Sequence, residues 1–243
     1  MNEQNIGPTY LCRKKMIVEA INKINPSTIL EVGCGSGDLA ERLSSKYDYT
    51  GIDINEHNIE SLKKSVPNGN FICINLFKFK SEKKFDLLIC SEVIEHVKND
   101  YAFIKRLSNY IKKGGFLLLS TPGRRNLVGK NDILAGHYRR YEFEDLNKLA
   151  TKSKLKIVNL YSIGIPIANL FKFYNDYRAG NILKNNKLHK KNMFELTKDS
   201  GIKKRNRFIS FIFNDLTMIP FYFLQQLFKR SQLGVDYFLV AQK

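Results

Sequence analysis

An apolar run that ends in alternating glycines constrains this chain more than any other feature. The run covers residues 28–32, and Gly33, Gly35 and Gly37 follow it before a helical pattern opens at Asp38. This order predicts a buried strand, a tight turn and a helix start, a layout that lets the backbone approach a nucleotide-like ligand closely. The dinucleotide fingerprint Gly-x-Gly-x-x-Gly would need its third glycine where this chain has Asp38, so the chain departs from that fingerprint.

An acidic residue ends the second predicted strand. The run 49–52 leads into Asp53, whose carboxylate can accept hydrogen bonds from ribose hydroxyls. With this pair of features the chain resembles the class I S-adenosylmethionine-dependent methyltransferases. Their first motif, Glu/Asp-x-Gly-x-Gly-x-Gly, is matched by residues Glu31–Gly37, and the acid that ends their second strand is matched by Asp53.

Strand and helix signals alternate along the first 165 residues, which favours a parallel sheet with helices on both faces. With the resemblance, we expect an α/β, doubly wound, mostly parallel seven-stranded sheet of the Rossmann-like methyltransferase type, with a helical, basic insertion before the last strand. Residues 1–165 and 234–243 would form the cofactor-binding core, and 166–233 the insertion or lid. Strands are expected at 28–32, 49–52, 70–74, 85–90, 116–120, 155–161 and 236–241, and helices at 9–24, from 38, from 55, at 100–111 and at 143–152.

Positive charge is concentrated toward the C-terminus. The net charge is +17, and residues 166–243 carry 14 of the 40 Lys and Arg but only 5 of the 23 Asp and Glu. A basic lobe favours phosphates, nucleic acid or an anionic membrane face. An AT-rich genome would also enrich a chain in Lys, Asn and Ile, so composition alone leaves the cause open.

The apolar segment 208–228 is interrupted by Asn214, Asp215 and Pro220, and its uninterrupted runs fall far short of the ~18 residues of a membrane span. Packing on the core or as a lid is the first interpretation. A helix at the membrane interface is the alternative. We therefore expect peripheral contact with an anionic membrane as one partner of the chain.

Ligands of open parallel sheets bind beyond the carboxyl ends of the strands, and polar or small residues follow each strand here. At the third strand Asn75 stands where the family more often has Asp, which keeps a carbonyl acceptor but drops the charge. Arg13 could pair with the carboxylate of the cofactor, or be a solvated neighbour of Lys14. The resemblance implies cofactor contacts from Arg13, Glu31, Gly33, Cys34, Gly35, Gly37, Asp53, Ile54, Asn75, Leu76, Ser91 and Glu92.

Glu92, Glu95 and His96 have the i, i+3, i+4 spacing that gathers side chains on one helical face. Two carboxylates and an imidazole could hold a divalent ion. We expect instead that these polar groups cap and line the turn, and we predict no metal site.

The run Gly136–Tyr141 lies after the fifth strand, on the sheet edge where the cofactor is expected. Guanidinium forks bind phosphate or carboxylate, and tyrosines can stack or donate. Related subfamilies that act on small molecules or on lipid- and sugar-linked acceptors carry a similar run. Tyr138, Arg139, Arg140 and Tyr141 are therefore predicted to bind substrate.

An oxygen acceptor must lose a proton, and His137 and His96 are the candidate bases. The alternative for each is a neutral histidine packed under the loop. An acceptor that is already an anion would need no base.

These features predict an S-adenosylmethionine-dependent methyltransferase, a biosynthetic enzyme whose acceptor is a small or lipid- or sugar-linked, anionic molecule, with O-methylation favoured. The alternative is an RNA or DNA methyltransferase that uses the basic C-terminal lobe. Enzymes that methylate exocyclic base amines usually carry Asn/Asp-Pro-Pro-Tyr/Phe after the fourth strand, where this chain has Cys90–Val93. A non-catalytic cofactor-binding protein is a third, weaker reading.

The cysteines and the N-terminus point to a reducing compartment. The four cysteines lack Cys-x-x-Cys spacing, which predicts reduced thiols in a cytosolic protein. Residues 1–8 are mostly polar and basic residues follow, so no signal peptide is expected. We expect a cytoplasmic protein, peripheral at the inner membrane face.

Overall fold

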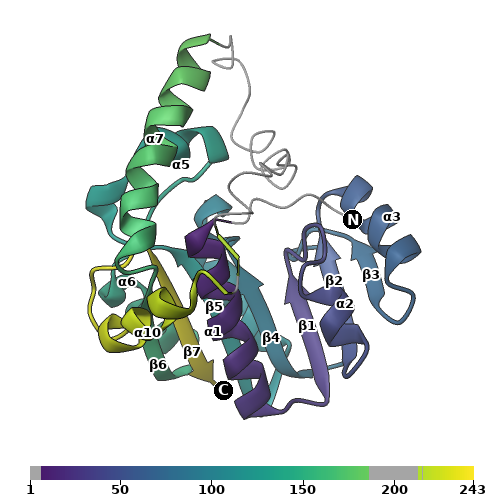
Figure 1. Ribbon diagram of the computed structural model, residues 1–243. Coiled ribbons are helices and arrows are strands. Elements are labelled where there is room, and N and C mark those ends of the chain that lie inside the picture. Colours follow the sequence, from purple (N-terminus) through teal and green to yellow (C-terminus); the bar gives the residue numbers. More distant parts are fainter. Residues whose placement is uncertain (1–6, 186–212, 215) are drawn as a thin grey trace.

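A seven-stranded sheet lies at the centre of this computed structural model, which describes residues 7–185, 213–214 and 216–243 (Figure 1). The strands are β1 (Thr28–Val32), β2 (Asp48–Asp53), β3 (Asn70–Cys73), β4 (Phe85–Ser91), β5 (Ile111–Pro122), β6 (Lys156–Ile163) and β7 (Asp236–Gln242). The helices are α1 (Pro8–Ile24), α2 (Ala40–Ser44), α3 (Glu56–Ser65), α4 (Asp100–Asn109), α5 (Lys130–Ala135), α6 (Phe143–Lys152), α7 (Ile167–Asn185) and α10 (Ile219–Phe228), with short 3₁₀ turns η1 (Ile94–His96) and η2 (Arg125–Leu127).

The strand order is β3-β2-β1-β4-β5-β7-β6. All neighbours are parallel except β7, which runs antiparallel to both β5 and β6. This arrangement confirms the predicted fold class. The order of strands reverses between β1 and β4, which is the switch point at which sheets of this kind bind their ligands.

Helices cover both faces of the sheet, as the alternation of signals predicted. On one face α1, α2 and α3 bury residues such as Ile21, Leu43 and Ile59 against the sheet. On the other, α4 and α6 bury Leu107 and Leu146. β4 contributes to both layers, because alternate side chains of a strand point to opposite faces, and its residues 87–90 are fully buried.

Most boundaries differ from the sequence prediction by one or two residues, and two of the differences have a clear physical reason. α2 begins at Ala40 rather than at residue 38, because the turn continues past the glycines and the Ala40 amide bonds to the Gly37 carbonyl. β5 begins at Ile111 rather than at residue 116, because Ile111 pairs with Phe85 of β4 and the Gly114 amide bonds to the Lys243 carbonyl. The residues around 111–115 carry no sequence pattern that would predict this pairing, because their partners are distant in the sequence.

Two helices, α7 and α10, represent the predicted insertion, and most of its basic stretch lies outside the described residues. α10 is fastened to β6 through the buried Gln225, whose amide donates to the Ser162 carbonyl at 2.5 Å and accepts from the Gly164 amide at 2.6 Å. α7 packs against α1 and α5. Among the described helices, none has the length and apolar composition to cross a bilayer. The domain division at residues 165 and 234 stays a prediction.

The Asp86 carboxylate clamps the start of β1 to β4. It accepts from the Thr28 amide and hydroxyl, both at 2.8 Å, and from the Lys112 ammonium at 2.8 Å. Burial acts in the opposite direction, but these bonds lower the pKa of Asp86 to about 2. The carboxylate therefore stabilises the fold above its unfolded pKa, and this contribution is lost as the pH falls toward 2.

We expect Asp86→Asn to lower the free energy of unfolding by about 1–2 kcal/mol at neutral pH, because hydrogen bonds to a charged acceptor are lost. Urea denaturation at pH 7 and at about pH 2.5 measures the effect, and the difference from wild type should shrink in acid. A difference that is the same at both pH values would contradict the assignment.

Candidate active site

The carboxyl ends of three central strands lie in register. Val32 of β1 pairs with Ile52 of β2 on one side and with Cys90 of β4 on the other. The segments that follow these strands therefore meet at one edge of the sheet. Two cavities open there, of about 400 Å³ and about 260 Å³, and both are lined by Gly33, Gly35 and Glu92.

Asp53 is fixed beside the glycine turn in the smaller cavity. One carboxylate oxygen accepts from the Gly35 amide at 2.8 Å and the other from the Asn55 amide at 2.8 Å. Each oxygen has a second lone pair, so the carboxylate can still accept from ribose hydroxyls. Among the predicted cofactor residues, Ile54, Asn75 and Leu76 line the same cavity. The Asn75 side chain is held in place by the Phe77 amide at 2.9 Å.

Gly35 offers the space that a nucleotide-like ligand needs. Its φ is +52°, and a Cβ built there would meet nothing within 4 Å and would project into open space at the cavities. Gly33, by contrast, has its missing Cβ position 2.3 Å from Val93. The turn thus brings backbone to the cavity without a side chain, and the residues present fit the predicted cofactor.

Arg13 joins three distant parts of the chain in the larger cavity. Its guanidinium contacts Glu92 and Asp236, each at 2.9 Å. Burial and the nearby Glu92 carboxylate raise the pKa of Asp236 to about 7, although Arg13 acts against this. The predicted partner of Arg13 was the carboxylate of the cofactor. In the structure the guanidinium is paired with protein carboxylates, and its contact with the cofactor stays a prediction.

The other predicted cofactor residues of β1 and β4 also line the larger cavity. Glu31 is buried beneath the turn and accepts from the Tyr49 hydroxyl at 2.6 Å, and burial raises the pKa of Glu31 to about 8. Burial likewise raises the pKa of the Cys34 thiol. The Ser91 hydroxyl lies 2.8 Å from that of Ser120.

His137 is oriented by a buried carboxylate. Its Nδ1 lies 2.9 Å from Asp132, which also accepts from Arg140 at 2.9 Å and from Lys172 at 3.3 Å. Although burial opposes it, these partners and the Gly129 amide lower the pKa of Asp132. A neighbouring carboxylate fixes the tautomer of an imidazole, so Nε2 is the nitrogen of His137 that can act on a ligand.

His96 and His137 form a pair at the boundary of the cavities. Their ring centroids are 4.8 Å apart in an edge-on arrangement, with His96 lining the smaller cavity and His137 the larger one. Glu95 lies beside them and is fully buried. Burial and Glu92 raise the pKa of Glu95 well above its usual range. The structure therefore brings together Glu95 and His96, which the spacing had paired, but turns Glu92 toward Arg13.

The predicted substrate residues are dispersed. Tyr138 lines the smaller cavity and Arg140 the larger one, where Arg140 is buried and bonded to Asp132 and to the Gly123 carbonyl. Arg139 points to Asp100 and lines neither cavity, and Tyr141 is only 2% exposed within the core. Neither position lines either cavity, and substrate contact by Arg139 and Tyr141 stays a prediction. Among the predicted cofactor residues, Gly37 lies outside the linings of both cavities. Its missing Cβ position is 2.1 Å from Leu62, so the absence of a side chain lets Leu62 pack against the turn.

Several lining residues were not anticipated from the sequence. Asp236 was seen only as the start of the last strand, and Asp132 was not singled out. Phe171, Lys172 and Arg178 reach the larger cavity from α7, in the insertion. The sequence of the expected insertion shows aromatic and charged residues there, but it does not tell which face of a helix meets the site.

Comparison with known proteins gives consistent matches. The profile of a methyltransferase domain family matches residues 6–160. The chain is 37% identical over 135 residues to a ubiquinone biosynthesis O-methyltransferase of Rickettsia canadensis, covering 52% of this chain and 57% of that protein. The protein of the same name from Rickettsia felis is 34% identical, with 52% and 55% covered. The chain therefore spans little more than half the length of these curated relatives.

Solved structures share the fold at low identity. An S-adenosylmethionine-dependent methyltransferase from Clostridium acetobutylicum superposes with a TM-score of 0.59 at 12% identity, covering 96% of this chain and 91% of that one. A magnesium protoporphyrin IX methyltransferase from Synechocystis, solved with bound S-adenosylhomocysteine, gives 0.53 at 17% identity, with 64% and 76% covered. At these identities the likeness concerns the fold alone.

Two glycines of the turn should respond differently to the same substitution. Both have positive φ, so alanine should cost about 1–2 kcal/mol of backbone strain at either site. Gly37→Ala should lower the free energy of unfolding by a further ~1–3 kcal/mol, because the new methyl group clashes with Leu62. Gly35→Ala should fold but no longer bind S-adenosylhomocysteine, because the added methyl group would project into the space that the ligand needs.

Thermal unfolding and calorimetric titration of the two variants measure these effects. Unchanged ligand binding by a folded Gly35→Ala protein would contradict the placement of the ligand at this turn.

Proposed function

The chain belongs to the methyltransferase domain family, as its sequence predicted, and we propose that it transfers a methyl group from S-adenosylmethionine to an oxygen of a small, lipid-type acceptor. The observation that carries the proposal is the paired placement of Asp53 and Gly35 at the switch point of the sheet. The names of the Rickettsia relatives, ubiquinone biosynthesis O-methyltransferases, support oxygen as the acceptor atom and a lipid-type molecule as its carrier.

We assign the adenosine of the cofactor to the smaller cavity and its amino-acid end to the larger one. In the smaller cavity Asp53 would accept from the ribose hydroxyls, while Asn75 and Leu76 would lie beside the adenine. In the larger cavity Glu31 and Arg13 would face the amino-acid end of the cofactor. Because Gly33 and Gly35 line both cavities, the reactive carbon would be held where they join, and the acceptor would enter from the larger one.

The cofactor supplies a methyl group already activated on a sulfonium. The acceptor oxygen forms a bond to the methyl carbon as the carbon–sulfur bond breaks, and that electron pair stays on sulfur. The protein must align oxygen, carbon and sulfur and exclude water, and positioning of this kind can supply ~7–11 kcal/mol. A hydroxyl acceptor also loses its proton, and we assign the promotion of this loss to His96 and His137, which stand where the two cavities meet.

The larger cavity combines aromatic and cationic side chains. Tyr10 and Phe171 lie in its wall together with Arg178, while the Arg13 and Lys172 side chains there are paired with carboxylates. Such a lining suits an acceptor that has both an apolar part and a negative charge. The anionic character of the acceptor is therefore part of the proposal.

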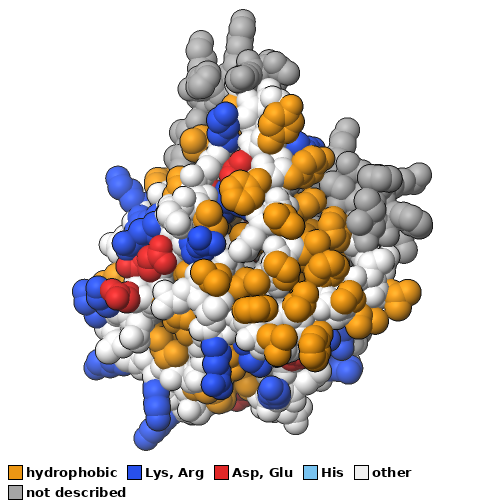
Figure 2. All heavy atoms as spheres, turned by 60° about the vertical axis from the view of Figure 1, so that its left-hand side comes forward, with side chains coloured by type: hydrophobic (Ala, Val, Ile, Leu, Met, Phe, Trp, Pro, Cys, Tyr) orange, Lys and Arg blue, Asp and Glu red, His pale blue; other side chains and the backbone are white. Residues whose placement is uncertain are grey.

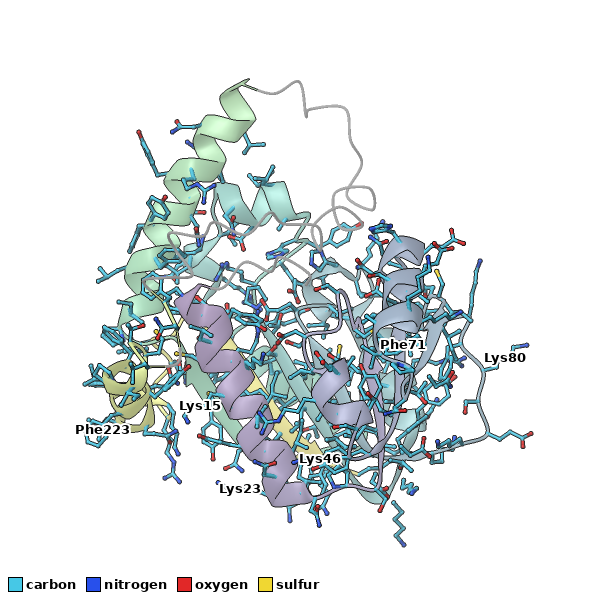
Figure 3. All side chains as sticks on the ribbon, turned by 45° about the vertical axis from the view of Figure 1, so that its right-hand side comes forward. Lys15, Lys23, Lys46, Phe71, Lys80 and Phe223 are labelled. Atoms are coloured by element: carbon cyan, nitrogen blue, oxygen red, sulfur yellow. The ribbon has the colours of Figure 1, made fainter. Side chains whose placement is uncertain are left out.

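An exposed apolar surface on α7 and α10 supports contact with a membrane. Hydrophobic side chains gather on the face that carries these helices, with Lys and Arg around them (Figure 2). Phe223 projects outward from α10, and Lys15 and Lys23 project from α1 (Figure 3). The apolar surface consists of Leu170, Phe173, Tyr174 and Tyr177 of α7 and Ile219, Phe223, Leu227 and Phe228 of α10.

Exposed aromatic and aliphatic residues framed by cations suit the interface of an anionic bilayer. We propose that this surface brings the larger cavity to a lipid-borne acceptor. Phe171 and Lys172 of α7 line that cavity while Phe173 and Tyr174 belong to the apolar surface, so one helix joins the two.

The function is tested by calorimetric titration with S-adenosylmethionine and by release of S-adenosylhomocysteine with candidate hydroxylated lipids. Asp53→Ala should abolish both, because hydrogen bonds to the ribose are lost and the Gly35 amide loses its partner. His57→Ala, an exposed position on α3, is the matched control and should bind normally. Equal cofactor affinity in Asp53→Ala and wild type would contradict the proposal. Methylation of RNA or DNA, but of no lipid-type acceptor, would favour the nucleic-acid alternative.

Membrane contact is tested by sedimentation with vesicles. Wild type should sediment with phosphatidylglycerol vesicles and only weakly with phosphatidylcholine vesicles. The double variant Phe223→Ser/Leu227→Ser should bind at least about fivefold more weakly, because exposed apolar area is removed. Tyr101→Ser, on α4 at the other face of the sheet, is the control and should bind as wild type does. Equal binding by wild type and the α10 variant would contradict this role.

A further inference from the structure

Three potential metal ligands lie together at the junction of the cavities. One ligand atom each from Glu95, His96 and His137 lies within 4.8 Å of the others. Glu95 and His96 belong to the short 3₁₀ turn η1, and His137 comes from the loop after α5. Spacing along the sequence had suggested Glu92 as the third member, but only the fold brings in His137.

The Glu95 carboxylate has an unsatisfied oxygen. Glu95 is fully buried, and its Oε2 accepts from the Thr121 hydroxyl at 3.1 Å. Across the described ranges 7–185, 213–214 and 216–243, no hydrogen-bond donor reaches Oε1. A buried carboxylate oxygen without a partner is costly, so a ligand that satisfies it would be favoured.

Both imidazoles are oriented in the manner of metal ligands. Nδ1 of His96 lies 3.1 Å from the Gly136 carbonyl, and Nδ1 of His137 lies 2.9 Å from the Asp132 carboxylate. Histidines that bind metals usually donate their other ring nitrogen to a carbonyl or carboxylate in this way. These bonds fix Nε2 of each ring as the atom that would face a cation.

The local charge also favours a cation. Arg13 is shared between Glu92 and Asp236, while Arg140 and Lys172 are engaged by Asp132. Among the ion pairs of the described residues, none includes Glu95. A divalent ion would supply the positive charge that this carboxylate lacks.

From this geometry we propose that Glu95, His96 and His137 bind a divalent transition-metal cation of the zinc type. Two imidazoles and one carboxylate are a donor set that suits such ions and leaves coordination positions open, whereas Mg²⁺ prefers oxygen ligands alone. The ligand atoms, which now lie within 4.8 Å of one another, would each form a bond of ~2.0–2.2 Å to the ion.

The position of the cluster links the cation to the proposed methyl transfer, and this part of the inference rests on the proposed function. An acceptor oxygen bound at an open position would lie between the two cavities, and a bound cation lowers the pKa of a hydroxyl. The two histidines would then promote loss of the acceptor proton through the cation rather than by accepting it themselves. The proton passes to solvent, so no further base is required.

Metal binding is measured on the full chain after removal of metals with a chelator. Titration with Co²⁺ should give one equivalent bound and a visible absorption band, Zn²⁺ should displace it, and Mg²⁺ should not. His96→Ala and His137→Ala should each weaken Co²⁺ binding by ~100-fold or more, since loss of even an outer partner of a ligand costs about 10–100-fold. His57→Ala is the matched control and should bind as wild type does.

Far-ultraviolet circular dichroism checks that each variant is folded. The wild-type titration tests the site even if a variant fails to fold. A metal-free wild-type chain that takes up no Co²⁺ at millimolar concentration would overturn the proposal, as would a folded His137→Ala variant with wild-type affinity. S-adenosylmethionine binding by the metal-free chain is measured separately. Loss of that binding with an intact Co²⁺ site would count against the proposed function and leave the metal site standing.

Discussion

The alignment of strand ends at the switch point is the constraint on which the rest of the structure depends. Because β1 pairs in register with both β2 and β4, the glycine turn, Asp53 and Glu92 all emerge at the same edge of the sheet. A shift of one residue would turn every side chain of a strand to the other face. The hydrogen bond between the Gly35 amide and Asp53 then ties the first two of these segments together.

A second set of contacts ties the insertion to the same edge. Lys172 of α7 and Arg140 of the loop both contact Asp132, and Asp132 orients His137. The helix that carries part of the exposed apolar surface is therefore coupled to His137, at the junction of the cavities, through the buried Lys172–Asp132 ion pair and the Asp132–His137 hydrogen bond. If the proposed membrane contact holds, this coupling would position His137 relative to the surface that delivers the acceptor.

Sequence patterns predicted those parts of the site that are formed by residues adjacent in the sequence. The glycine turn and the acid after β2 could be assigned because strand ends and positive φ leave a signature in a few residues. Contacts across the chain had no such signature: Asp236 meets Arg13 only because β7 inserts antiparallel beside β5. The run Gly136–Tyr141 shows that a local pattern can also suggest a contact that the fold does not use. Its polar residues suggested ligand binding, but Tyr141 is held in the core by hydrogen bonds to Pro122 and Asp100.

A crystal structure of the chain with S-adenosylhomocysteine would show whether the smaller cavity receives the adenosine of the cofactor. We expect ribose hydroxyls within hydrogen-bond distance of Asp53, adenine beside Asn75 and Leu76, and the sulfur close to Gly33 and Gly35. Density for the ligand elsewhere, or a cavity still empty at saturating ligand, would contradict it.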